Sequence, residues 1–355
     1  MKRGSGLGGR AAGVGIGLLA AACAPADPVS GASVGVARAA IVGGDASPAE
    51  RDAVVFLVHV GAKGWEFSCS ATLVAPNLLL TARHCVSEIG DPNVACDADG
   101  RQVAGGALGK DRDATGFAVY IGARTPQAAT SGAPAAKGRA IVHDGAATLC
   151  GHDLAFLVLD RDVPNAVIAP LRLSAPPTVG EELVAVGYGQ TSSGAAPAVR
   201  QERSGVRVRF VGPNADPAVA PRDFVVSESD CEGDSGGPGL SPLTGAVVGV
   251  ATRVGTAKGT ATCLDSKANP LFVFYTQMAA FGETTQRAFA AAGHEPWQEG
   301  QPAPGTANDP GCGPCALGAR GGSGSRAGFA VVALLALRAA RRSGPRSRRD
   351  RTRGS

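Results

Sequence analysis

The fold class predicted for this sequence is all-β. The prediction depends on the resemblance carried by four short motifs, described below, and two further observations agree with it. Four short motifs follow one another along the chain, at residues 41–44, 81–85, 153–155 and 233–238. Two apolar runs beside these motifs, Leu78–Leu80 and Leu154–Leu159, are typical of buried strands. Six of the nine cysteines lie between residues 41 and 293, an even number that is typical of an exported domain held by disulfides.

The last motif, Cys231-Glu232-Gly233-Asp234-Ser235-Gly236-Gly237-Pro238, places a serine hydroxyl inside a glycine-rich turn. Such a turn can direct several backbone N–H groups at one point, so that a nucleophile and an oxyanion hole are built together. Ser235 is therefore a candidate nucleophile.

A candidate base and a candidate orienting acid lie upstream of this serine. His84 follows the apolar run at residues 78–80 and precedes Cys85, and Cys69 lies sixteen positions before that cysteine. A disulfide between the two cysteines would hold the imidazole in place. Asp153 precedes a buried-looking strand, where its carboxylate can hold the second nitrogen of the imidazole.

The spacing Gly233-x-Ser235-x-Gly237 also fits the nucleophile elbow of the α/β-hydrolases. That fold requires a histidine after the serine, and the candidate there, His294, lies in a proline-flanked segment. The order His84, Asp153, Ser235 excludes this alternative. Three other histidines have no motif around them and are expected to have structural roles: His59, His143 and His152.

Together, the segments Ile41–Gly44, Thr81–Cys85, Asp153–Ala155 and Gly233–Pro238 resemble the four signatures of the chymotrypsin/trypsin family, in that family's order. The resemblance covers roughly residues 41–293 and implies two six-stranded antiparallel β-barrels, a short C-terminal helix and an active site in the cleft between the barrels. The activity that it implies is that of a serine endopeptidase.

In the mechanism implied by this resemblance, Ser235 attacks a peptide carbonyl while His84 takes its proton and Asp153 fixes the imidazole tautomer. The backbone N–H groups of Gly233 and Ser235 would hold the oxyanion, and water would release the acyl-enzyme. No cofactor is implied. No metal is implied either, because Cys/His clusters with zinc spacing are absent from the sequence, and Cys312-x-x-Cys315 has no partner pair.

The resemblance also implies a zymogen. A cut before Ile41 would free an α-amino group, which would pair with Asp234. Arg38-Ala39-Ala40 precedes the cut here, so the bond to be broken follows alanine and not a basic residue. This departure disfavours a trypsin-like activator.

The substrate pocket is predicted to be narrow. Ser229 stands where trypsin has its specificity aspartate, and Asp230 follows it. Val254 and Val273 match the pocket walls, with Thr252 as a further substrate-binding residue. Branched side chains there would block a long or aromatic P1 residue, so we predict a preference for small apolar P1 residues such as Ala or Val. Asp230 keeps a basic P1 preference open.

The disulfides implied by the family are Cys69–Cys85 and Cys231–Cys263, which leaves Cys96 and Cys150 as the economical third pair. A glycine-rich span at residues 97–116 has the composition of an inserted surface loop.

The two ends of the chain are expected to lie outside the protease domain. Residues 1–24 are typical of an export signal and residues 25–40 of a short propeptide, with Cys23 as an alternative lipidation site. Residues 294–326 are rich in proline and glycine and indicate a linker. Residues 327–355, an apolar segment and an arginine-rich tail, resemble the sorting tails of myxobacterial surface proteins; a merely disordered basic tail is the alternative.

The charge distribution gives no indication of nucleic-acid binding. The chain has a formal net charge of +4, but residues 338–355 alone contain eight arginines and one aspartate, so the remainder is net negative. We expect a secreted or cell-surface monomer that acts on proteins or peptides, with membrane anchoring through Cys23 or the tail left open. The alternative from another class is a catalytically silent binding module, which would usually lack a triad residue or the activation isoleucine.

Overall fold

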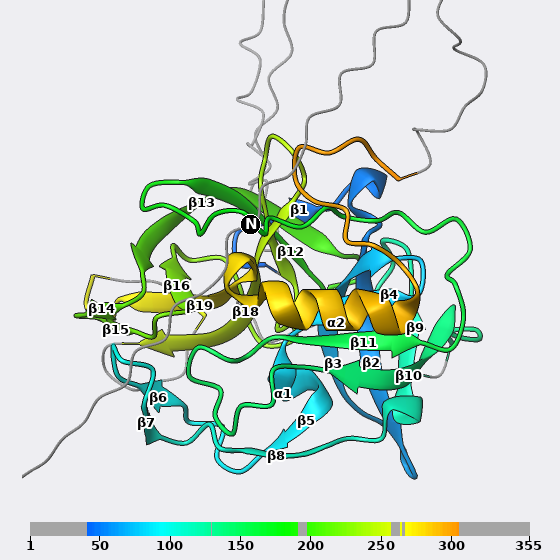
Figure 1. Ribbon diagram of the computed structural model, residues 1–355, viewed down its shortest axis with the longest axis horizontal. Helices are drawn as coiled ribbons and strands as arrows, with labels where there is room; N and C mark the ends of the chain where they lie inside the picture. The colour runs from blue at the N-terminus through cyan, green and yellow to red at the C-terminus, as the bar shows by residue number, and fades with distance from the viewer. Residues whose placement is uncertain (1–40, 129, 191–196, 257–262, 265–266, 305–355) are drawn as a thin grey trace, which may run out of the picture. The chain divides into compact units, whose positions relative to one another are not determined.

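The computed structural model describes residues 41–128, 130–190, 197–256, 263–264 and 267–304 (Figure 1). They belong to one compact unit, which ends at Pro304. The predicted export signal, propeptide and C-terminal tail lie outside the described residues.

The first barrel is closed and has six antiparallel strands in the order β10-β11-β4-β3-β2-β9. These strands are β2 (Val54–Gly61), β3 (Gly64–Ala75), β4 (Leu78–Thr81), β9 (Phe117–Tyr120), β10 (Ala136–Val142) and β11 (Ala155–Leu159).

The second barrel has the strand order β13-β12-β17-β18-β19-β16 and is closed by pairing of β13 with β16, while β1 adds to the outer edge of β13. These strands are β1 (Asp45–Ala46), β12 (Glu182–Gly187), β13 (Gln201–Val211), β16 (Asp223–Val226), β17 (Pro238–Leu240), β18 (Val247–Thr256) and β19 (Leu271–Gln277). The expected pair of six-stranded antiparallel barrels is confirmed.

Short elements complete the described part of the chain. Strands β5 (Ser87–Ile89) and β8 (Leu108–Asp111) pair with each other, as do β6 (Ala95–Cys96) and β7 (Gln102–Ala104), and β14 (Asn214–Ala215) and β15 (Ala218–Val219). The helices are α1 (Arg83–Val86), α2 (Gly282–Ala292) and three 3₁₀ turns, η1 (Ala49–Arg51), η2 (Ala114–Gly116) and η3 (Met278–Phe281). The inserted span expected at residues 97–116 therefore contains β7, β8 and η2.

The expected C-terminal helix, α2, ends where Gly293 adopts a left-handed conformation with φ 78°. Figure 1 shows this helix lying across strand β11, and Phe289 of α2 meets Phe156 of β11 with ring centroids 6.4 Å apart.

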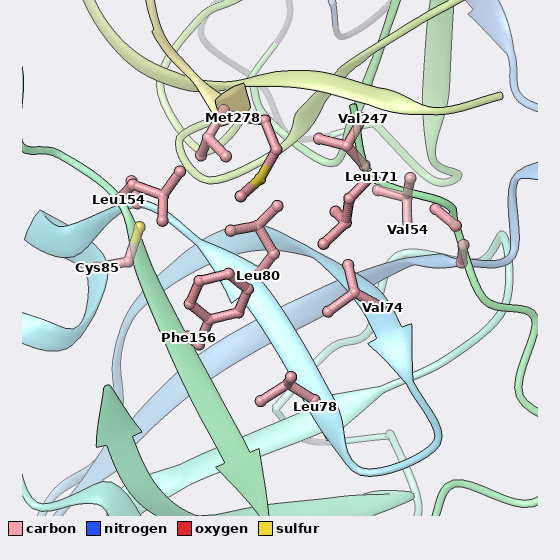
Figure 2. Close-up of a cluster of buried hydrophobic side chains, with 14 of the residues drawn as sticks. Val54, Val74, Leu78, Leu80, Cys85, Leu154, Phe156, Leu171, Val247 and Met278 are labelled. Carbon is pink, nitrogen blue, oxygen red and sulfur yellow. The ribbon is translucent and has the colours of Figure 1, made fainter. Parts of the chain in front are cut away.

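The apolar runs of β4 and β11 are continuous because both faces of these strands are buried. Leu79 and Leu157 point into the interior of the first barrel. Their neighbours on the other face, Leu80 and Phe156 among them, belong to a second cluster that includes Met278 from beyond the second barrel (Figure 2). A strand with two buried faces reads as an unbroken apolar run. This shared core brings the ends of β4 and β11 close to the second barrel.

Residues 294–304, placed in a linker by the sequence analysis, run along the domain as part of the compact unit. The N–H of Leu171 donates to the carbonyl of Trp297 at 2.8 Å, and Glu299 accepts from Arg172 at 2.6 and 3.0 Å. In the part of the chain that the structure describes, no helix is long and apolar enough to cross a membrane.

Candidate active site

The histidine and aspartate of the predicted triad lie side by side. His84 is in α1, directly after β4, and Asp153 directly precedes β11, the strand paired with β4. The ring Nδ1 of His84 lies 2.8 Å from Oδ2 of Asp153, and the backbone N–H of His84 donates to Oδ1, also at 2.8 Å. Because the carboxylate accepts from Nδ1, the second ring nitrogen, Nε2, is left free to accept a proton.

Burial and charge set the basicity of this imidazole. Burial lowers the pKa of His84, but the charge and the hydrogen bond of Asp153 raise it more, so that the pKa lies above its ordinary value. Arg253 opposes this rise by placing a positive charge nearby. Asp153 is 2% exposed, which favours a fixed carboxylate shielded from water.

The disulfide-bonded sulfur of Cys85 lies near both His84 and Ser235. The sulfur of Cys85 lies 3.8 Å from Nε2 of His84 and 3.7 Å from the carbonyl oxygen of Ser235, and Cys85 is bonded to Cys69. The N–H of Ser70 donates to the same Ser235 carbonyl at 2.9 Å. The atoms of Cys69, His84 and Cys85 come within 4.8 Å of one another, but the disulfide leaves no thiolate to bind a metal.

The turn around Ser235 has a conformation that only glycine adopts easily. Gly233 and Gly236 have φ values of +96° and +82°, and a Cβ on Gly236 would lie 2.1 Å from Oγ1 of Thr81. Among the described residues, no backbone carbonyl accepts from the N–H groups of Gly233 and Ser235. These two donors are available to hold a developing oxyanion.

Asp234, inside this turn, is buried and hydrogen-bonded to the backbone. Its carboxylate accepts from the N–H groups of Gly189 at 2.8 Å and Cys231 at 3.0 Å, and from the backbone N–H of Ile41. Both Ile41 and Asp234 are fully buried. Burial and the nearby charge of Asp230 raise the pKa of Asp234 well above its usual range.

Comparison with known proteins agrees with this geometry. A family model described as Trypsin matches residues 41–269, which is more than half of the chain. The chain belongs to the trypsin family. Members of this family are serine-type peptidases that act on proteins, and those with disulfides are commonly extracellular. No curated protein matches the chain.

The six cysteines of this trypsin-family domain form three disulfides: Cys69–Cys85, Cys96–Cys150 and Cys231–Cys263. These are the pairs expected from the sequence. The bond from Cys96 joins the inserted β6 strand to the segment that leads to Asp153.

The predicted pocket residues Ser229 and Asp230 are both buried. Oδ2 of Asp230 accepts from the hydroxyl of Ser229 at 2.5 Å and from that of Tyr275 at 2.7 Å. Burial raises the pKa of Asp230 to about 6. Tyr275 was not among the site residues predicted from the sequence. Its hydrogen bond to Asp230 makes it a further member of this site.

The predicted wall residues meet across two strands. Val254 on β18 and Val273 on β19 are direct partners, and both pack in the core of the second barrel. Thr252 lies at the β-bulge of β18, between Ala251 and Arg253. Its hydroxyl donates to the carbonyl of Phe274 at 3.2 Å.

The sequence reasoning missed Arg253, which lies between two predicted pocket residues. Its guanidinium donates to Asp223 at 3.2 Å and stands 4.0 Å from the centre of the Phe274 ring. Asp223 is fully buried. An arginine as the single charged residue of strand β18 was the available signal.

A cavity of about 390 Å³ beside Gly233 was also missed. Its lining comes from separate strands and loops and includes Phe56, Trp65, Phe67, Tyr188 and Glu232. Because these residues are far apart in the chain, no local sequence pattern could have predicted the cavity.

Proposed function

We propose that this chain is a secreted serine endopeptidase, made as a zymogen, in which His84, Asp153 and Ser235 act as base, orienting acid and nucleophile. The observation that carries the proposal is the 2.8 Å bond from His84 Nδ1 to Asp153, together with the Cys85 sulfur that contacts both His84 Nε2 and the Ser235 carbonyl.

In this mechanism His84 takes the proton of the Ser235 hydroxyl as its oxygen attacks the peptide carbonyl. The N–H groups of Gly233 and Ser235 hold the oxyanion, and His84 then gives the proton to the leaving amine. Water hydrolyses the acyl-enzyme by the same steps, with His84 again as base.

Activation would follow a cut before Ile41. The burial of Ile41 and its bond to Asp234 support this proposal, because the freed amine would replace the peptide N–H at a buried carboxylate. Activity should then fade at alkaline pH as the amine loses its proton, since a free α-amino group has a pKa of about 8, which the pair raises. A rate that stays flat to about pH 11 would argue against the pair.

For specificity we propose small apolar P1 residues, because Val254 and Val273, which the family resemblance matches to the pocket walls, are direct partners on β18 and β19. Asp230 supports the second candidate, a basic P1 residue, since one oxygen of its buried carboxylate is capped by two hydroxyls and no cation bonds to it in the described part of the chain. A panel of P1 substrates separates the two: fastest cleavage after Ala or Val supports the first, and fastest cleavage after Arg or Lys the second.

The decisive experiment is labelling of the exported protein with a fluorophosphonate, followed by mass spectrometry of the labelled species. Label on Ser235 in a form that begins at Ile41 supports an active protease matured after Ala40. Ser235→Ala is the control and should not react. A correctly cut wild-type chain without label would favour a catalytically silent binding module.

A further inference from the structure

The mechanism does not use Arg83, the residue directly before His84. Arg83 is 4% exposed, and its guanidinium contacts Ser87 and Asp111. Nε donates to the hydroxyl of Ser87 at 2.8 Å, and Nη2 donates to Oδ1 of Asp111 at 3.4 Å. The Ser87 hydroxyl donates to the same carboxylate oxygen at 2.6 Å. Asp111 comes from β8, so the inserted segment supplies the anion that holds this buried arginine.

The same carboxylate reaches the segment that carries Asp153. Oδ2 of Asp111 accepts from Nε2 of His143 at 2.8 Å, while Nδ1 of His143 accepts from the N–H of Gly145 at 3.0 Å. His143 therefore contacts both β8 and the backbone that follows it. One carboxylate therefore connects the helix of His84 with the start of the 143–153 segment.

The inserted segment also makes backbone hydrogen bonds to the 143–153 segment. The N–H of Leu108 donates to the carbonyl of Ala147 at 2.9 Å, and the N–H of Leu149 donates to that of Gly106 at 2.9 Å. The disulfide from Cys96 joins the same segment covalently. The insertion thus contacts both chain segments that bring the histidine and the aspartate together.

Stability alone does not account for a buried arginine at this place. Its Nη1 is buried and has no hydrogen-bond partner among the described residues. A buried charge with an unsatisfied donor costs free energy, and replacement by an apolar side chain is often neutral or stabilising. Burial lowers the pKa of Arg83, as expected for a cation held at some cost.

We propose that Arg83 and Asp111 are positioning residues, which fix the 2.8 Å contact between His84 and Asp153 by clamping both of their chain segments to the inserted strand β8. This inference rests on the proposed function. A displacement of about 1 Å in such a contact can lower a rate about a hundredfold.

The test compares Arg83→Ala and Asp111→Ala with Asp113→Ala in the mature enzyme. Asp113 is a matched control, since it lies two residues after Asp111 and, within the described residues, its side chain accepts hydrogen bonds from Thr115 alone. We expect kcat to fall about 10- to 100-fold in the first two variants, with KM nearly unchanged. Arg83→Lys should keep more activity than Arg83→Ala, and added guanidinium ion should restore part of the activity of Arg83→Ala.

A second readout does not depend on turnover. In the Ser235→Ala background, the low-field proton resonance of His84 Nδ1 should shift or broaden in Asp111→Ala and stay unchanged in Asp113→Ala. If the wild-type protein is inactive, the proposed function is wrong, but the His84 resonance still tests whether Arg83 and Asp111 position the histidine. If Arg83→Ala does not fold, the kcat and the His84 resonance of Asp111→Ala test the proposal. An unchanged kcat with an unchanged resonance, or a loss confined to KM, would overturn the proposal.

Discussion

Removal of the Cys96–Cys150 disulfide should cost more stability than removal of Cys69–Cys85. A disulfide stabilises a protein mainly by restricting the unfolded chain, and the effect grows with the logarithm of the loop that it closes. The two bonds span 54 and 16 residues. The loop-entropy relation gives about 4 kcal/mol for the first and about 3 kcal/mol for the second at 25 °C.

The assay is denaturant unfolding of Ser235→Ala protein, which cannot digest itself, with both cysteines of one pair replaced by alanine. The difference between the two variants should be about 1 kcal/mol, with Cys96→Ala/Cys150→Ala the less stable. A larger loss for Cys69→Ala/Cys85→Ala would refute the reasoning and would show that local packing at the buried Cys85 outweighs loop entropy.

Three further outcomes are expected. Asp153→Asn should lower the pKa of His84, because Asp153 raises it. Since His84 acts as a base while it is neutral, the acid limb of the kcat/KM profile should move to lower pH. The value of kcat should fall by about 10⁴-fold, as in this family's best-known triad. An acid limb that stays in place would contradict this. Gly236→Ala should lower the free energy of unfolding by more than about 3 kcal/mol. The new Cβ would lie 2.1 Å from Oγ1 of Thr81, and the alanine backbone would have to adopt a positive φ. Gly180→Ala, with a similar φ but nothing within 4 Å, should cost only about 1–2 kcal/mol in the same urea titration. Deletion of residues 294–355 should lower stability by about 2 kcal/mol relative to deletion of 305–355 in thermal unfolding, because it removes the Glu299 carboxylate from Arg172; equal stability would argue that this pair contributes nothing.

The catalytic candidates could be predicted because their signals are local. Each of His84, Asp153 and Ser235 lies at the border of an apolar strand or inside a glycine-rich turn, and their order matched one family. Family resemblance then implied both barrels, which strand patterns alone did not. The continuous apolar runs of β4 and β11 were also readable, since both faces of these strands are buried.

The surroundings of these residues depend on contacts between distant segments. Arg83 was noticed as a charge beside His84, but its sequence position did not show that the guanidinium turns toward Asp111, 28 residues away. Asp230 was placed near the pocket, while the two hydroxyls that cap it come from its neighbour and from β19.

The sequence by itself determined which groups are candidates for the chemistry, because strand periodicity, glycine-rich turns and cysteine spacing are properties of short segments. Only the tertiary structure decided how those groups are held. Hydrogen bonds, burial and charge act through space. The pairing of β19 with both β16 and β18 brings together side chains such as Asp223 and Arg253, whose separation along the chain carries no local pattern.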